Sequence, residues 1–222
     1  MNPRFRRRGS APRALPTLAG AAALLYGLLF GLHRRWGIDF WWWMEFNLAV
    51  LIVAAIVSDS EFRVSLAGDL RAGLVRNIEW GILAAVLLYV VFFAGNLLAR
   101  RLFPFAAGGI QAVYQLRQEA SFARILSLMV FWIGPGEEVF WRGYLQGSLA
   151  RRFGAVSGYL MASALYAAVH LPSGNPMLVL AAAVCGLFWG WLYLRWGSIV
   201  LNAVSHTAWD IAVFLLFPFT GP

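Results

Sequence analysis

The sequence contains no lysine, a single cysteine and few charged side chains. All 18 basic residues of the 222-residue chain are arginine, and 13% of the residues are charged, about half the roughly 25% of a soluble domain. A lone Cys185 excludes a disulfide framework, a CxxC redox pair and a zinc ribbon. No internal repeat, low-complexity tract or domain-separating linker is visible in the sequence. These absences argue against a soluble or disulfide-stabilised protein.

The composition instead indicates an integral membrane protein. Hydrophobic residues make up 61% of the chain, and the mean hydropathy is +0.69. The net charge of +8 could indicate nucleic-acid binding, but the arginines form short clusters between apolar runs. That pattern is typical of membrane topology. We therefore expect the lipid bilayer, and no nucleic acid, as a partner.

Runs of about 20 apolar residues, the length that crosses a bilayer, predict an all-α, polytopic transmembrane helix bundle. Residues 58–77 and 100–121 mix apolar and charged side chains, which favours amphipathic helices at the interface. Because 100–121 is ambiguous, the expected number of spans is about seven, with a range of six to eight. The predicted spans are 15–32, 41–57, 78–99, 122–147, 154–171, 176–194 and 198–218.

The placement of arginine predicts the orientation. With seven spans, twelve of the 18 arginines fall in segments on the N-terminal side of the membrane and six on the other. Positive charge accumulates on the cytoplasmic side. We therefore expect a multi-pass protein of the cytoplasmic (inner) cell membrane, with its N-terminus in the cytoplasm.

Two adjacent carboxylates, Glu137 and Glu138, lie inside an apolar stretch. An ionisable side chain near the bilayer centre costs roughly 2.5–3.5 kcal/mol, so it is a candidate functional residue. The preceding Gly134-Pro135-Gly136 predicts that the helix breaks and restarts there. Spacing of i,i+4 lets Glu138 pair with Arg142, which leaves Glu137 as the candidate reactive carboxylate.

Two further spans carry polar side chains at a similar depth. His170 ends one apolar run, with Tyr166 one turn earlier, and Asn202, His206 and Asp210 form a stripe along the last span. Counting about 1.5 Å per helical residue from the same membrane face places His170 and His206 at a height similar to that of Glu137. Three helices could thus line one cavity. A water-filled vestibule, an interfacial histidine and interhelical hydrogen bonds are the simpler alternatives.

These motifs together resemble those of the CAAX-protease and bacteriocin-processing (CPBP) family, intramembrane endopeptidases related to the type II CAAX prenyl protease. The resemblance covers about residues 120–215 and implies two parts of one membrane unit, N-terminal helices in 1–121 and a catalytic bundle in 122–218. Two positions depart from the family pattern, Tyr166 for Phe and Asp210 where Asn is common. The motif residues are Glu137, Glu138, Arg142, Tyr166, His170, His206 and Asp210.

The resemblance implies that Glu137 and His170 activate water, and that His206, oriented by Asp210, stabilises the oxyanion. Glu138, Arg142, Tyr166 and Asn202 would support them. A mechanism without metal or other cofactor is favoured. If zinc were bound, Glu137, His170 and His206 would be its ligands.

The expected substrate is a membrane-anchored protein or peptide. Prenylated CAAX ends, C-terminal sorting tails and bacteriocin-related peptides all remain open. The alternatives to a protease are a non-enzymatic scaffold or immunity protein and a small proton-coupled transporter, since buried Glu, His and Asp also serve proton relays.

Overall fold

A computed structural model describes residues 11–71 and 73–219, and within these residues every regular element is a helix. The long helices are α1 (Leu15–Trp36), α2 (Phe40–Ser58), α4 (Leu74–Leu102), α10 (Pro176–Trp196) and α11 (Ile199–Asp210). The shorter α-helices are α3 (Ser60–Arg71), α5 (Ala106–Tyr114), α6 (Phe122–Leu128), α7 (Gly134–Glu137), α8 (Gly147–Phe153) and α9 (Ala155–Ala168). Three segments are π-helical, η3 (Met129–Ile133), η4 (Glu138–Gln146) and η6 (Ile211–Leu216), and η2 (Gln115–Glu119) and η5 (Leu171–Ser173) are 3₁₀ turns.

Local sequence signals fix the helix ends. Asn175 caps α10 by accepting hydrogen bonds from the next backbone amides, and Pro176 occupies the first turn, where its missing N–H costs nothing. Gly197 ends α10 with a φ of 63°, a left-handed conformation that favours glycine. Ser198 then caps α11. This tight connection sets α10 and α11 side by side in opposite directions.

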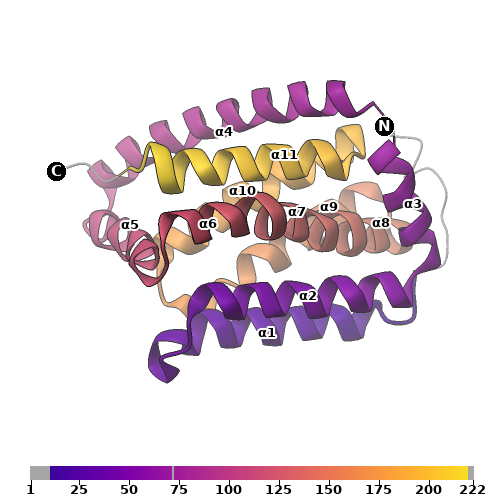
Figure 1. Ribbon diagram of the computed structural model, residues 1–222, viewed down its shortest axis with the longest axis horizontal. Coiled ribbons are helices and arrows are strands. Elements are labelled where there is room, and N and C mark those ends of the chain that lie inside the picture. The colour runs from indigo at the N-terminus through magenta and orange to yellow at the C-terminus, as the bar shows by residue number, and fades with distance from the viewer. Residues whose placement is uncertain (1–10, 72, 220–222) are drawn as a thin grey trace.

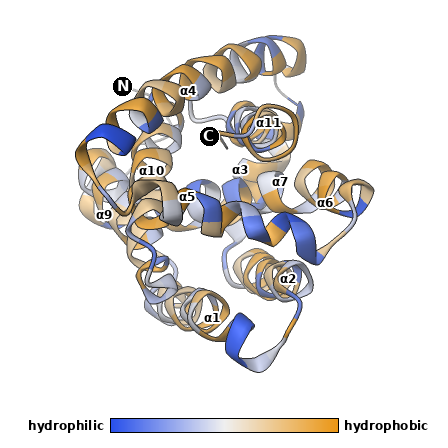
Figure 2. Cartoon of the chain, turned by 90° about the vertical axis from the view of Figure 1, so that its left-hand side faces the viewer, coloured by the Kyte–Doolittle hydropathy of each residue, from blue (hydrophilic) through white to orange (hydrophobic). Residues whose placement is uncertain are grey.

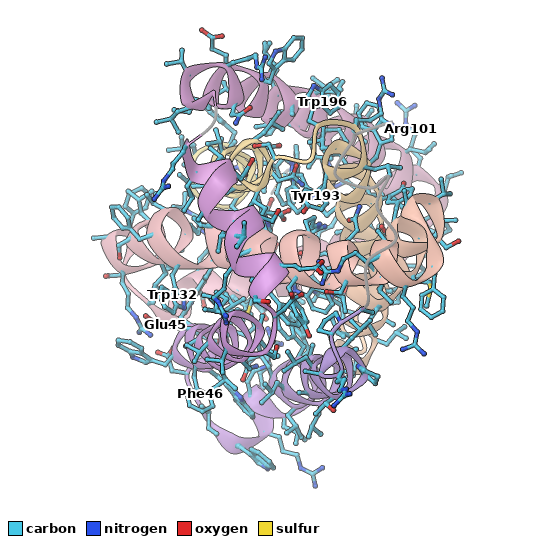
Figure 3. All side chains as sticks on the ribbon, turned by 90° about the vertical axis from the view of Figure 1, so that its right-hand side faces the viewer. Glu45, Phe46, Arg101, Trp132, Tyr193 and Trp196 are labelled. Atoms are coloured by element: carbon cyan, nitrogen blue, oxygen red, sulfur yellow. The ribbon has the colours of Figure 1, made fainter. Side chains whose placement is uncertain are left out.

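The helices form a bundle around one central helical run. The run from α6 to α8 passes through the middle, with α1 and α2 on one side and α4 and α11 on the other (Figure 1). At one end of the bundle, α5 crosses in front of the long helices (Figure 2). At the opposite end α3 crosses them (Figure 3). Trp132 of the central run lies beside Glu45 of α2 (Figure 3) and donates 3.1 Å to its backbone carbonyl. The central run therefore carries the Glu pair in the middle of the molecule.

The fold confirms the predicted all-α membrane bundle. Each of the seven predicted spans is occupied by helix. Within residues 11–71 and 73–219, five helices are long and apolar enough to cross a bilayer, namely α1, α2, α4, α10 and the α11–η6 unit. The segment 122–147 lies in the composite central run, and α9 has only 14 residues before the chain turns at η5. The two segments expected at the interface contain α3 and α5.

One local prediction was wrong. The helix does not break at Gly134-Pro135-Gly136 but continues from α6 to α8, with π-helical turns before and after α7. The Gly134 amide bonds to the Met129 carbonyl, five residues back. Such wide turns accommodate a proline, which has no amide hydrogen and crowds the preceding turn. The Glu pair therefore lies inside a continuous helix and not at a new N-terminus.

The orientation count also needs one correction. Arg142 was counted as a loop charge, but its side chain is 2% exposed at the centre of the bundle. Without Arg142, eleven arginines lie in segments on the N-terminal side of the membrane and six lie on the other side. Four of the eleven precede residue 11 and lie outside the described residues. The cytoplasmic N-terminus stays a prediction, as does the division between 121 and 122.

Candidate active site

A close helix contact brings the Glu pair to the last span. A Cβ atom added to Gly134 would lie 2.3 Å from Thr207 Oγ1, so only glycine permits this approach of α7 to α11. Thr207 is next to His206 on α11. Gly134 thus sets the distance between the carboxylates of the central run and the imidazole of His206.

Glu138 is the centre of a buried polar network. Its Oε1 accepts 2.9 Å from Arg142 Nη1 and lies 2.8 Å from His206 Nδ1, and its Oε2 accepts 3.1 Å from Asn202 Nδ2. The ion pair with Arg142 confirms the prediction from spacing. The carboxylate and guanidinium are 0% and 2% exposed, so each needs the other as partner.

His206 is held on three sides. Its ring stacks on Trp189, with centroids 3.7 Å apart, and Glu138 holds its Nδ1. Its Nε2 lies 3.5 Å from Asp210 Oδ2 and 4.0 Å from Glu137 Oε2. Glu138 is thus the carboxylate that is hydrogen-bonded to the ring, at Nδ1. Asp210, expected to orient the ring, lies at the other nitrogen, which faces Glu137.

Glu137 contacts two tyrosine hydroxyls. Tyr166 donates 2.6 Å to its Oε2, and Tyr26 of α1 donates 3.2 Å to its Oε1. All three side chains are buried. Hydrogen bonds from neutral donors stabilise a charged carboxylate in a dry environment. Glu137 has no ion pair with an arginine in the described part of the chain, as its position in the helix predicted.

His170 lies at the end of α9, where the chain enters η5. Its Nδ1 is 2.7 Å from the Tyr166 carbonyl oxygen. Because a carbonyl only accepts, Nδ1 carries the hydrogen, and a neutral ring then leaves Nε2 as an acceptor. The Phe30 ring packs against the imidazole with centroids 4.4 Å apart. The backbone and α1 together fix the ring orientation.

One cavity of about 170 Å³ joins these groups. Its walls include Glu137, His170, His206 and Asp210, so it brings together the four side chains expected to be catalytic. It extends toward the end of the bundle where α5 lies, because Leu116 of η2 and the first turns of α2 and α10 also contribute. The residues of these two turns that line the cavity are Phe40, Trp41 and Leu178.

The possible zinc set does not fit this arrangement. Across residues 11–71 and 73–219, no three His, Cys, Asp or Glu side chains are grouped as metal ligands. Glu137 Oε2 and His206 Nε2 are 4.0 Å apart, whereas two ligands of one tetrahedral zinc ion, each about 2.0–2.2 Å from the metal, are roughly 3.3–3.6 Å apart. We derive no catalytic step through a metal.

Sequence reasoning missed three aromatic residues of the site. Tyr26 and Phe30 of α1 contact Glu137 and His170, and Trp189 of α10 supports His206. Tyr26 did carry a signal, because a hydroxyl inside an apolar span needs a hydrogen-bond partner. Phe30 and Trp189 were indistinguishable from ordinary apolar packing.

Fold and site together define a multi-pass helical membrane protein with a buried cluster of carboxylates and imidazoles. Residues 119–212 match the family model described as type II CAAX prenyl endopeptidase Rce1-like. The match confirms the resemblance to the CAAX-protease (CPBP) family over this segment, and at the level of the family it supports a CAAX-type intramembrane endopeptidase. No curated protein and no solved structure matches the chain.

Proposed function

We propose that this protein hydrolyses a peptide bond of a membrane-associated protein or peptide, with a water molecule activated by Glu137. The observation that carries the proposal is the shared cavity, in which Glu137 and His206 Nε2 face each other at 4.0 Å beside His170. That separation is too long for a hydrogen bond. Both groups therefore remain available to a water molecule and a substrate carbonyl.

Glu137 is the general base in this mechanism. Its carboxylate takes a proton from water while the water oxygen attacks the carbonyl carbon, which gives a tetrahedral intermediate. The same proton then passes to the leaving nitrogen as the C–N bond breaks. The Tyr26 and Tyr166 hydroxyls hold the carboxylate in one orientation. His170 Nε2, an acceptor in the neutral ring, provides a second anchor for the water.

His206 stabilises the oxyanion in this mechanism. With Nδ1 held by Glu138, a protonated ring presents Nε2–H on the cavity side. A single fixed donor of this kind contributes about 2.7–4 kcal/mol to stabilising the transition state. The Arg142–Glu138–Asn202 network keeps the ring in place. Asp210 Oδ2, 3.5 Å from Nε2, places a negative charge beside the protonated ring.

The substrate class follows from the position of the site. The cluster lies within the spans, so the scissile bond must come from a segment that reaches into the bilayer, such as a membrane-anchored sorting tail. With eleven arginines on the N-terminal side against six, we place the protein in the cytoplasmic membrane with its N-terminus inside. The same polar groups could relay protons in a transporter, or have no catalytic role in a scaffold.

The proposed function is tested by comparing the termini of membrane proteins in cells that express the native chain, Glu137→Gln or Glu45→Gln. Glu45 lies on α2 away from the cavity and serves as the matched control. We expect at least one membrane protein to be shortened by the native chain and by Glu45→Gln, but not by Glu137→Gln. Identical termini in all three strains would refute the protease. Uptake that collapses with the pH gradient would instead support a transporter.

A further inference from the structure

A second and larger cavity lies next to the site. It encloses about 350 Å³ between α4, α5, α10 and the α11–η6 unit, and its walls are almost entirely apolar. Val91 of α4 and Leu180 of α10 line it and are 43% and 47% exposed. Both belong to membrane-spanning helices. The cavity is therefore a groove that opens toward the lipid between α4 and α10, and its volume is within the range of ligand sites.

The groove and the site cavity share part of their walls. Asp210, which lies 3.5 Å from His206, lines both spaces. The other shared residues are Met129, Leu178, Ala181, Trp209 and Phe214. A chain lying in the groove would therefore contact the same wall residues that line the cavity of Glu137 and His206.

Trp209 at this shared wall carries an unsatisfied polar group. Its side chain is 9% exposed, and its ring packs on Phe92 of α4 at 4.6 Å between centroids. Within the described residues its indole Nε1–H has no hydrogen-bond partner. Buried indole donors are normally paired. The Nε1 atom itself is covered by neighbouring atoms, so a ligand that supplies an acceptor would pair with it once the indole turns toward the groove.

We propose that this groove binds the apolar stretch of a substrate polypeptide next to its scissile bond, admitted from the bilayer between α4 and α10. The proposal rests on the proposed function. A polypeptide fits better than a lipid chain, because its backbone carbonyl can accept from Trp209 Nε1–H and a hydrocarbon chain cannot. Backbone polar groups at membrane depth need such partners. The apolar walls then select hydrophobic side chains beside the cleaved bond.

A glycine in the groove provides a specific obstruction. Gly95 of α4 lines it, and a Cβ atom there meets nothing within 4 Å. Gly95→Leu therefore adds a bulky side chain to the wall of the groove at a position where its Cβ meets no neighbour. Gly20 of α1 also has nothing within 4 Å of its Cβ and lines neither space. Gly20→Leu is the matched control for the same change on a spanning helix.

The test uses photocrosslinking in the full-length chain. p-Benzoylphenylalanine replaces Leu180 at the rim of the groove, and the protein is reconstituted in phosphatidylcholine vesicles with a synthetic 20-residue Leu-Ala transmembrane peptide as probe. We expect a peptide adduct whose yield falls roughly tenfold with Gly95→Leu, equivalent to about 1.4 kcal/mol of binding, and stays unchanged with Gly20→Leu. Adducts of phosphatidylcholine alone, or a yield insensitive to Gly95→Leu, would overturn the proposal.

This experiment separates binding from hydrolysis. Peptide capture needs no bond cleavage, so it is repeated with Glu137→Gln, and we expect the same yield. If Glu137→Gln blocks cleavage in cells while Gly95→Leu affects neither capture nor cleavage, the protease stands and the groove fails. If capture depends on Gly95 but termini are unaffected by Glu137→Gln, the groove binds polypeptide and the proposed mechanism fails.

Discussion

Tyr26 Oη donates a hydrogen bond of 3.2 Å to Glu137 Oε1, although 111 residues separate the two in sequence. Tyr26 belongs to α1, outside the segment 119–212 that matches the family model. One turn later, Phe30 packs on His170. The first helix therefore completes the wall of a site whose polar side chains expected to be catalytic all come from the C-terminal half.

This contact predicts that Tyr26→Phe lowers cleavage while the chain stays folded. A hydrogen bond to a charged group contributes about 1.5–3 kcal/mol, so we expect a loss of activity of roughly tenfold or more. Tyr89→Phe is the control, because it removes a bond from a tyrosine hydroxyl to a backbone carbonyl, that of Phe217, away from the site. Cleavage rates of the reconstituted proteins are the measurement. Equal rates for both variants would remove Tyr26 from the mechanism.

Two of the arginine–carboxylate pairs, Arg142–Glu138 and Arg124–Asp39, should differ in their contribution to stability. Arg142→Met leaves Glu138 buried without its counter-charge, which costs about 3–5 kcal/mol. The Arg124–Asp39 pair is 26% and 31% exposed, so Arg124→Met should cost about 1 kcal/mol or less. Thermal unfolding in detergent compares the two variants. A smaller shift for Arg142→Met than for Arg124→Met would contradict the buried network.

We expect the cleavage rate to tolerate replacement of the Asp210 carboxylate by an amide. Asp210→Asn keeps a polar group 3.5 Å from His206 and adds an N–H donor at the position where the oxyanion forms. We expect cleavage at or above the native rate for Asp210→Asn and a clear loss for Asp210→Leu. Rates measured on one substrate with both variants decide this. A complete loss with Asp210→Asn would mean that the charge of this carboxylate is required.

The Arg124–Asp39 pair also predicts a pH dependence. The hydrogen bond from the Arg124 guanidinium holds the pKa of Asp39 below its usual value. A carboxyl whose pKa is lower in the folded state stabilises the fold above its unfolded pKa of about 3.9, and this contribution is lost as the pH falls through the folded value. The Tm difference between the native chain and Asp39→Asn should therefore be present at neutral pH. The Tm difference should vanish once the pH is below the pKa of Asp39 in the folded state. A Tm difference that stays constant with pH would exclude a contribution from the ionised Asp39 carboxylate.

Periodicity and apolar length were enough to predict the helices, because each span is specified by its own residues. The i,i+4 relations, such as Glu138 with Arg142, are equally local. The contacts of Tyr26 and Trp189 depend on which helices pack together, which no single segment encodes. The partner of His206 Nδ1 could not be predicted either. Asp210, one turn away on the same helix, was the local candidate, whereas Glu138 reaches the ring only through the approach permitted by Gly134.

The wide turns around Gly134 show the limit of sequence rules at a functional site. Proline between two glycines normally indicates a helix break. Here the π-helical turns η3 and η4 absorb the disruption, and such turns are frequent at functional sites. Within this continuous helix one carboxylate meets Tyr26 and the other meets Arg142.

The most direct test of the central claim is the cleavage rate of an identified substrate by the purified, reconstituted native chain and by Glu137→Gln at equal folded concentration. Our account predicts that Glu137→Gln reduces the rate at least a hundredfold, the lower contribution of a general base, with unchanged thermal stability. A rate for Glu137→Gln within a few-fold of the native value would show that another group activates the water.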